Sequence, residues 1–191
     1  MNIEKSNIAN LPTKYGKFKI RAYKQNNQEH LAIMSQNFEE LDAPFVRVHS
    51  ECLTGDTLGS LKCDCQNQLD LALKFIAQHG GLVIYHRQEG RNIGLLNKVN
   101  AYALQDKGRN TIEANLELGF GEDDRDYSIV EEILKDLNIK KLKLITNNPK
   151  KIEYIKSLGV DIVERIPAIT KSNKFNEHYI NTKKEQMGHM F

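Results

Sequence analysis

The 191-residue chain is predicted to form a single α/β domain, 1–191, whose mixed sheet joins parallel strand–helix units to an N-terminal antiparallel portion. Three observations predict this fold. The length is that of one domain. From residue 68 onward, segments with the apolar spacing of amphipathic helices alternate with short apolar runs typical of buried strands. Before residue 45, two extended segments flank a polar turn, as in an antiparallel hairpin.

The N-terminal part is expected to consist of strands. Residues 16–23 and 31–35 flank the polar stretch QNNQEH and are predicted to pair as an antiparallel hairpin or meander. A third strand is predicted over 45–51, where apolar and polar residues alternate, so that the polar side chains share one face. That face, which would point toward the first cysteine, carries Arg47, His49 and Glu51.

The middle of the chain is predicted to form a helix, a strand and a second helix. The first helix starts at Gln68, has apolar residues recurring about every 3.6 positions, and stops at Gly80 and Gly81. A buried strand over 82–85 follows, and the second helix covers 93–107. The side chains of the second helix that are expected to face inward are Leu96, Val99, Ala103 and Leu104.

The C-terminal half continues the alternation after an irregular stretch. Residues 108–126 are acidic and punctuated by glycine at their end, which favours a functional loop over a buried element. The tail, about residues 171–191, is predicted to be polar and loosely ordered. The remaining predicted elements are a helix over 128–137 capped by Asp126 or Ser128, a strand over 142–146, a helix from Pro149 to just before Gly159, and a strand over 160–167.

Composition excludes several classes of protein. The chain has no apolar run near the roughly 20 residues that a membrane span needs, and its N-terminus lacks the features of a signal peptide. We therefore expect a cytoplasmic protein without a membrane partner. A formal net charge of +2 is too small for nucleic-acid binding driven by general electrostatics, so no nucleic-acid partner is expected.

All three cysteines of the chain lie in one short stretch, as Cys52, Cys63 and Cys65. In a reducing cytoplasm an odd number of clustered thiols favours metal binding over disulfides, and three thiolates suit Zn²⁺. The fourth position would hold water in a catalytic site, or His49 in a closed structural site. The alternative is that these cysteines are small buried hydrophobic residues. Their polar and glycine-containing surroundings favour the metal.

Two basic loops follow predicted parallel strands and are candidates for binding an anion. Arg87 and Arg91 bracket a Gln-Glu-Gly loop, and Lys150 and Lys151 lie at the start of a helix, whose free N–H groups attract phosphate. Both loops would lie at the same edge of the sheet. Taken alone, each loop is more consistent with solvated surface charge than with an anion site. The acidic run GEDDRD could hold Mg²⁺ or supply a base, or could be a solvated loop.

Seven blocks occur in this order along the chain: RVHSECLTGD, SLKCDCQNQL, YHRQEGRNIGLLNK, AYALQDKG, DDRDY, LITNNPKK and NEHY…TKKEQMGH. Together they resemble GTP cyclohydrolase II, the enzyme that opens riboflavin biosynthesis, over about residues 45–190. The resemblance implies a Zn²⁺- and Mg²⁺-dependent homodimer. It would hydrolyse GTP to a diaminopyrimidinone carrying a phosphoribosylamino group, formate and pyrophosphate, with zinc-bound hydroxide opening the imidazole ring at C8.

The resemblance also assigns roles to residues. It makes Cys52, Cys63 and Cys65 the zinc ligands. Asp123 corresponds to the proton acceptor of the family and Arg125 to its proposed nucleophile, while Tyr102 matches a tyrosine near the reacting base. Because an arginine side chain does not readily lose its proton, Arg125 could instead stabilise phosphate charge. The residues placed around GTP are Arg47, Val48, His49, Ser50, Glu51, Gln68, Glu89, Gly90, Arg91, Thr111, Thr146 and Lys151.

Two other functions compete with this one. A zinc-stabilised RNA-binding module, with His49 completing a structural site, would use the basic loops and tail without catalysis, although such modules usually show interleaved aromatic residues or a strong basic bias. A related enzyme could release only pyrophosphate or stop at a formylated intermediate. The ratio of formate to pyrophosphate separates that enzyme from the complete reaction.

Overall fold

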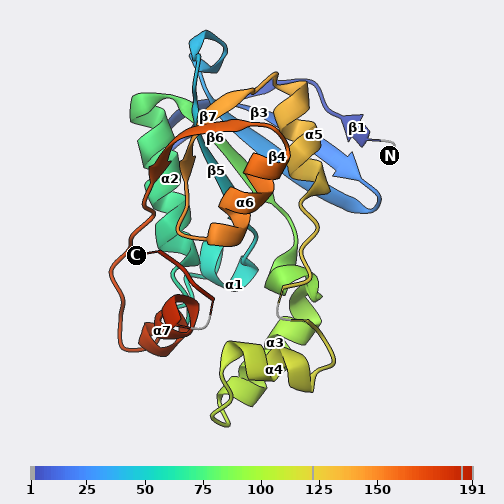
Figure 1. Cartoon of the computed structure of the whole chain (residues 1–191), viewed down its shortest axis with the longest axis vertical. Helices are drawn as coiled ribbons and strands as arrows, with labels where there is room; N and C mark the ends of the chain where they lie inside the picture. The colour runs from blue at the N-terminus through green and yellow to red at the C-terminus, as the bar shows by residue number, and fades with distance from the viewer. Residues whose placement is uncertain (1–2, 122, 186, 191) are drawn as a thin grey trace.

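The computed structural model of the protein describes residues 3–121, 123–185 and 187–190. Within these residues the centre of the fold is an eight-stranded sheet in the order β1-β3-β4-β6-β5-β7-β8, with β2 also pairing with β3 (Figure 1). The strands are β1 (Ile3–Lys5), β2 (Ala9–Thr13), β3 (Gly16–Gln25), β4 (Gln28–Ser35), β5 (Phe45–Ser50), β6 (Gly81–His86), β7 (Lys141–Ile145) and β8 (Asp161–Ile166).

The sheet is antiparallel in its N-terminal part and parallel in the rest. Strands β3 and β4 form the predicted hairpin, in which Gln25 pairs with Gln28 and Asn26 has a φ of 55° in the turn. Strand β4 runs antiparallel to β6, whereas β6, β5, β7 and β8 are mutually parallel neighbours. The structure therefore confirms the predicted mixed α/β sheet. The prediction of a single domain stays a prediction.

The helices begin and end largely where the sequence places their signals. Gly80, with a φ of 81°, follows the last residue of α2, and Pro149 opens α6 after Asn148, whose side chain accepts a bond from the Lys150 N–H at 2.9 Å. The helices are η1 (Phe38–Glu40), α1 (Leu53–Asp56), α2 (Cys65–His79), η2 (Glu89–Asn92), α3 (Gly94–Gln105), α4 (Thr111–Glu117), α5 (Ser128–Asp136), α6 (Pro149–Ser157) and α7 (Glu177–Glu185).

Hydrophobic cores cover both faces of the sheet. On one face Val46, Val48 and their neighbours pack against α5 and α6, and on the other Val83 and Ile145 pack against Ile76 of α2. Because side chains alternate along β5, Arg47 and His49 point away from the face of Val46 and Val48, toward the α2 face. The polar side chains of this strand are therefore directed to the side on which α2 begins.

Helices α3 and α4 pack on each other and extend away from the sheet (Figure 1). The expectation of an irregular loop over 108–126 is wrong in part, because Asn110 and Glu113 form a capping box that starts α4. The inward face predicted for α3 is also wrong. Leu96 and Val99 are 74% and 52% exposed, and the face turned toward the molecule contains Lys98, because that face lines a polar pocket.

The C-terminal tail is more ordered than the sequence predicts. It contains α7, and Asn176, Thr182, Lys183 and Met187 are buried. The low hydropathy of the tail is misleading, because its polar side chains are buried in hydrogen bonds and ion pairs rather than in an apolar core. Residues 186 and 191 of the predicted tail lie outside the described residues. None of the described helices is both long and apolar enough to cross a lipid bilayer.

Candidate active site

One pocket lies at the edge of the sheet where β5, β6 and β7 end. The segments that follow all three strands line it, because β5 lies between the other two and the strands are parallel. Helices α3 and α4 supply a second wall, and the C-terminal part of the chain supplies a third. The prediction that the two basic loops meet at one edge of the sheet is confirmed.

The three cysteines converge at this pocket, with their sulfur atoms all within 4.8 Å of one another. The Sγ atoms of Cys52 and Cys63 are 3.6 Å apart, close to the spacing of about 3.8 Å between sulfurs on a tetrahedral zinc. A Cβ added at Gly55 would lie 2.8 Å from the Sγ of Cys63 and 3.0 Å from that of Cys52. Glycine at this position therefore leaves room for the sulfurs to meet, and the donor set fits a zinc ion.

The thiols of this cluster ionise in a coupled way. Hydrogen bonds from Cys63 and Cys65, together with the charge of Lys98, lower the pKa of Cys52. Hydrogen bonds with Cys52 raise the pKa of Cys63 to about 11 and that of Cys65 well above its ordinary value. The cluster therefore accepts a first negative charge readily and resists further ionisation. A divalent cation would reverse this resistance, because it stabilises every thiolate that it binds.

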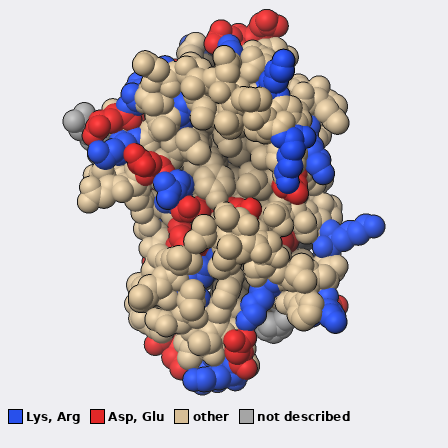
Figure 2. All heavy atoms as spheres, turned by 180° about the vertical axis from the view of Figure 1, so that it is seen from behind, with Lys and Arg blue, Asp and Glu red and all other residues tan. Residues whose placement is uncertain are grey.

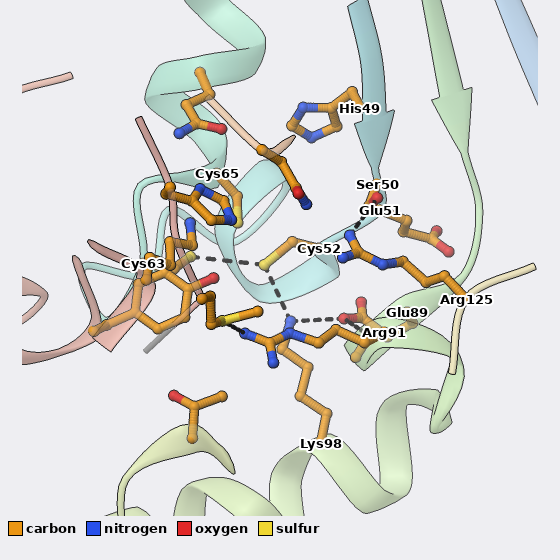
Figure 3. Close-up of a pocket in the computed structure, with 18 of the residues that line it drawn as sticks. His49, Ser50, Glu51, Cys52, Cys63, Cys65, Glu89, Arg91, Lys98 and Arg125 are labelled. Atoms are coloured by element: carbon orange, nitrogen blue, oxygen red, sulfur yellow. Dashed lines mark hydrogen bonds and ion pairs between the residues drawn. The ribbon is translucent and has the colours of Figure 1, made fainter. Parts of the chain in front are cut away.

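Lys98 of α3 lies against the cysteine cluster, as Figure 3 shows. Its Nζ atom donates to the Sγ of Cys52 at 3.0 Å and to Oε1 of Glu89 at 2.7 Å. Burial opposes the charge of Lys98, but the Cys52 thiolate and the Glu89 carboxylate outweigh it and raise its pKa. Glu89 also accepts a bond from the backbone N–H of Leu53 at 2.6 Å, so it joins α3 to the start of α1.

His49 is held apart from the sulfurs by its own partners. Its Nε2 atom lies 3.0 Å from Oδ2 of Asp56, and its ring stacks on Tyr85 with centroids 5.5 Å apart. Burial lowers the pKa of His49, which keeps the ring neutral. Among the described residues, the group able to hold a metal ion consists of the three cysteines without a histidine. This geometry gives no support to a closed site completed by His49.

Arg125 is fixed by an acidic partner and a serine. Its guanidinium donates to both carboxylate oxygens of Asp123, at 2.7 and 2.5 Å, and to Oγ of Ser50 at 2.9 Å. Burial disfavours the charge on Arg125, but the hydrogen bonds that it donates to Asp123 outweigh this effect and raise the pKa of the arginine. Burial likewise opposes ionisation of Asp123, and the bonds from Arg125 lower its pKa. Both groups are therefore charged near neutral pH.

Lys151 adds a second buried cation to the same end of the pocket. Its Nζ atom donates to the carbonyl oxygen of Val48 at 2.7 Å. Burial, followed by the charges of Arg125 and Arg47, holds the pKa of Lys151 well below its usual value. Like charges enclosed together are destabilising unless an anion joins them. This end of the pocket is therefore suited to bind phosphate.

The loop after β6 brings Arg91 to the pocket through an uncommon backbone conformation. Gly90, Arg91 and Asn92 have φ angles of 61°, 62° and 76°. Positive φ at two successive residues with side chains stores conformational energy, which is common in ligand-binding loops. The Nη2 atom of Arg91 lies 3.2 Å from the Sδ of Met187, so this loop also contacts the C-terminal part of the chain.

The predicted site residues converge, with two exceptions. Val48 packs in the core and reaches the site only through its carbonyl group, and Asp123 contacts it through Arg125. Tyr102 lines the pocket, and its hydroxyl lies 3.0 Å from Oγ1 of Thr54. The predicted residues that line the pocket are Arg47, His49, Ser50, Glu51, Cys52, Cys63, Cys65, Gln68, Glu89, Gly90, Arg91, Tyr102, Thr111, Arg125, Thr146 and Lys151.

Several pocket residues were missed by reasoning from the sequence. Lys98 shares one helical face with Ala101 and Tyr102, and that spacing could have revealed it once Tyr102 was placed in the site. The C-terminal residues lie in the block NEHY…TKKEQMGH, but no site role was assigned to them, because their positions depend on how the tail folds back. The missed residues of the tail are Tyr179, Lys183, Met187 and His189.

Known proteins that are similar to this chain share one family description. The family model described as GTP cyclohydrolase II matches residues 4–167. The chain is 60% identical over 191 residues to the GTP cyclohydrolase-2 of Campylobacter fetus subsp. fetus, covering 100% of this chain and 97% of that protein. It is 56% identical to that of Campylobacter hominis, with 100% and 96% covered, and 48% identical to that of Shigella boydii, with 100% and 98% covered. The chain therefore belongs to the GTP cyclohydrolase II family.

Proposed function

We propose that this protein is a zinc-dependent hydrolase that converts GTP and water to formate, pyrophosphate and a diaminopyrimidinone carrying a phosphoribosylamino group. This reaction is the first step of riboflavin biosynthesis. The proposal rests mainly on one arrangement, in which the cysteine cluster and the buried cations Arg125 and Lys151 line the same pocket. A purine triphosphate matches both parts of this pocket. Its ring carbon would be hydrolysed at the cysteine cluster, and its anionic phosphate chain would bind the cations.

At the metal end, Cys52, Cys63 and Cys65 would hold Zn²⁺, which supplies a Lewis acid that lowers the pKa of water for attack at C8 of guanine. The ammonium of Lys98 offsets the negative charge of the thiolates, since it bonds directly to one of them. The ring of Tyr102 forms the adjacent wall. This side of the pocket would therefore position the imidazole part of the base.

At the basic end, Arg47, Arg91, Arg125 and Lys151 would hold the triphosphate, and Mg²⁺ would supply further positive charge to it. His49 and Gln68 line the space between the ends. Asp123 stays ionised beside Arg125 and keeps the guanidinium oriented toward Ser50. We assign Arg125 the role of stabilising phosphate charge, because its raised pKa disfavours the neutral guanidine that a nucleophile requires.

The charge distribution on the face that Figure 2 displays differs from that of a surface made for a polyanion. Figure 2 shows Lys and Arg mixed with Asp and Glu over the face that it displays. A nucleic-acid interface usually presents a continuous basic stripe. Arg47, Arg125 and Lys151 instead lie together in the pocket, where a single small anion would meet them.

We further propose that the protein is a homodimer and that it works in the cytoplasm, where its thiols stay reduced. Exposed apolar side chains on the outlying α3–α4 pair support the dimer, since a second copy could cover them. They are Leu95, Leu96, Val99 and Leu116.

The test of this function combines metal analysis with product analysis. Purified wild-type protein should contain one zinc per chain and should release formate and pyrophosphate from GTP in equal amounts, with turnover that requires added Mg²⁺. Cys65→Ser should lose zinc and formate release while retaining measurable GTP affinity, because the phosphate contacts come from other segments. Equal formate release by the variant and the wild type, or a wild type without zinc, would refute the proposal.

A further inference from the structure

The C-terminal segment, residues 173–185 and 187–190, closes one side of the pocket. It supplies Tyr179, Lys183, Met187 and His189 to the lining. Its end is hydrogen-bonded to the loop before α6, since the backbone N–H of Met190 donates to the carbonyl oxygen of Asn147 at 2.8 Å. The match to the family model ends at residue 167, so the segment lies beyond it.

Two buried side chains of the C-terminal segment bind the turn that carries two of the three cysteines. Nδ2 of Asn176, a fully buried residue, donates to the backbone carbonyl of Cys63 at 3.3 Å. Nζ of Lys183 donates to Oδ1 of Asp64 at 2.7 Å, and both of these side chains are buried. The segment therefore contacts the backbone of one cysteine and the side chain of the residue between Cys63 and Cys65.

The carboxylate of Asp64 is held from the opposite direction as well. Its Oδ2 atom accepts a bond from Nε2 of Gln68 at 2.6 Å, and Oε1 of Gln68 accepts one from Nη2 of Arg47 at 2.5 Å. The Asp64 side chain thus joins the C-terminal segment to α2 and to β5. Since one residue separates the two cysteines, any rotation of the Asp64 backbone would redirect both thiols.

We propose that Asn176 and Lys183 are positioning residues, which hold the turn Cys63–Asp64–Cys65 in the geometry that binds zinc. This inference rests on the zinc site of the proposed function. Without Lys183 the Asp64 carboxylate would stay buried beside Gln68 with its ion pair broken, which is costly. The turn would then move to hydrate the carboxylate, and the sulfur atoms of both cysteines would move with it.

The experiment measures zinc release from the full-length, zinc-loaded protein into an excess of a chromogenic chelator. Lys183→Met should release zinc about 10- to 100-fold faster than the wild type, as expected when a partner that orients a ligand is lost. Asn176→Ala should change the release rate in the same direction. Lys183→Arg keeps the ion pair and should release zinc at nearly the wild-type rate. In Co²⁺-loaded protein, the thiolate charge-transfer absorption should weaken in Lys183→Met and be restored in Lys183→Arg.

Lys184→Met is the matched control, because Lys184 is the exposed neighbour of Lys183 on α7. It should release zinc at the wild-type rate. Asp64→Asn combined with Lys183→Met should release zinc more slowly than Lys183→Met alone, because no unpaired charge remains. If Lys183→Met and Lys184→Met release zinc equally, the positioning role is wrong while the zinc enzyme stands. A wild type that holds no zinc would overturn the proposed metal site and this inference together.

Discussion

At the scale of single residues, the site is built from buried charges that are compensated by specific partners. Asp123 neutralises Arg125, and Glu89 and Cys52 neutralise Lys98. Each pair leaves the cation with a raised pKa and a fixed direction. Lys151 and Arg47 are exceptions, since their hydrogen bonds among the described residues go to neutral oxygens and burial lowers their pKa values. A bound phosphate would supply the negative charge that Lys151 lacks among these contacts.

The role of Arg125 can be tested by changing its shape and its charge separately. Arg125→Ala should lower the rate of pyrophosphate release about 100-fold or more, since one preorganised charged donor is lost. Arg125→Lys should recover part of that rate, because a charge stabiliser needs the cation more than the guanidinium. Rapid-quench experiments with α-labelled GTP should trap no protein that carries the α-phosphate, whereas a γ-label would leave with pyrophosphate in either mechanism.

A loss of activity in the Arg125 variants could come from a less stable fold rather than from a slower reaction, so stability is measured as well. Arg125→Ala leaves Asp123 buried and unpaired, which costs stability. The double variant Asp123→Ala/Arg125→Ala removes both charges and should melt at a higher temperature than Arg125→Ala while staying inactive. A labelled phosphoguanidine adduct, or an inactive Arg125→Lys with wild-type stability and GTP affinity, would contradict charge stabilisation and favour covalent catalysis.

At the scale of elements, α3 has two faces with opposite chemistry. Lys98 and Ala101 are buried toward the pocket, whereas Leu96 and Val99 face outward. Soluble helices usually bury the apolar face. The reversed arrangement supports the proposal that a second copy of the chain covers the outward face of α3.

This interface predicts how α3 substitutions change assembly. Leu96→Glu should shift the protein from dimer to monomer in sedimentation velocity at micromolar concentration, because a charge would be buried without a partner. Val163→Glu in β8 is the control, since Val163 is also exposed but lies on another element, and it should stay dimeric. A dimer that persists in Leu96→Glu and dissociates in Val163→Glu would place the interface elsewhere.

Helix ends and the hairpin were predicted correctly, because they depend on residues that are close together in the sequence. The Pro149 start of α6, the Gly80 stop of α2 and the pairing of β3 with β4 each depend on nearby residues, and the structure confirms them. The orientation of α3 and the order of the tail depend on contacts between distant segments. Lys183 looked like a solvated charge until its pairing with Asp64 was visible.

The same distinction applies to the site. Cysteine spacing and the seven sequence blocks predicted a cluster of thiols and most of the pocket lining, and the structure brings these residues together. Composition alone would not have found Lys98, because a lysine within a helix is normally exposed. The bond from Lys98 to Cys52 requires α3 to pack over the cysteine cluster, which only the tertiary structure shows.

At the scale of the whole molecule, two buried histidines connect the sheet to the segment before α5. His30 of β4 and His86 of β6 stack with ring centroids 5.2 Å apart, and His86 also stacks on Tyr127. Nδ1 of His30 accepts a bond from the backbone N–H of Arg87, and Nε2 of His86 donates to the carbonyl of Asp126. A second proton on His86 would lie on its buried Nδ1, which has no hydrogen-bond partner among the described residues. A second proton on His30 would lie on Nδ1 and would remove the acceptor of the Arg87 N–H.

These histidines predict that the fold loses stability in acid. Burial, with the charge of Arg87, lowers the pKa of His30 from 6.5 to about 4, and burial, with the neighbouring His30, lowers that of His86 to about 3. Their pKa values are lower in the folded state, so the unfolded chain binds more protons below pH 6.5. The contribution of the two neutral rings to the free energy of unfolding is fully present above pH 6.5. It decreases as the pH falls toward the pKa values of the folded state, by up to about 1.4 kcal/mol per pH unit for each ring.

The variant His86→Phe keeps the ring stacking but cannot take up a proton. Urea unfolding of metal-free protein between pH 7.5 and 5 should therefore give a shallower pH dependence for the variant, and parallel curves would show that His86 does not control acid stability.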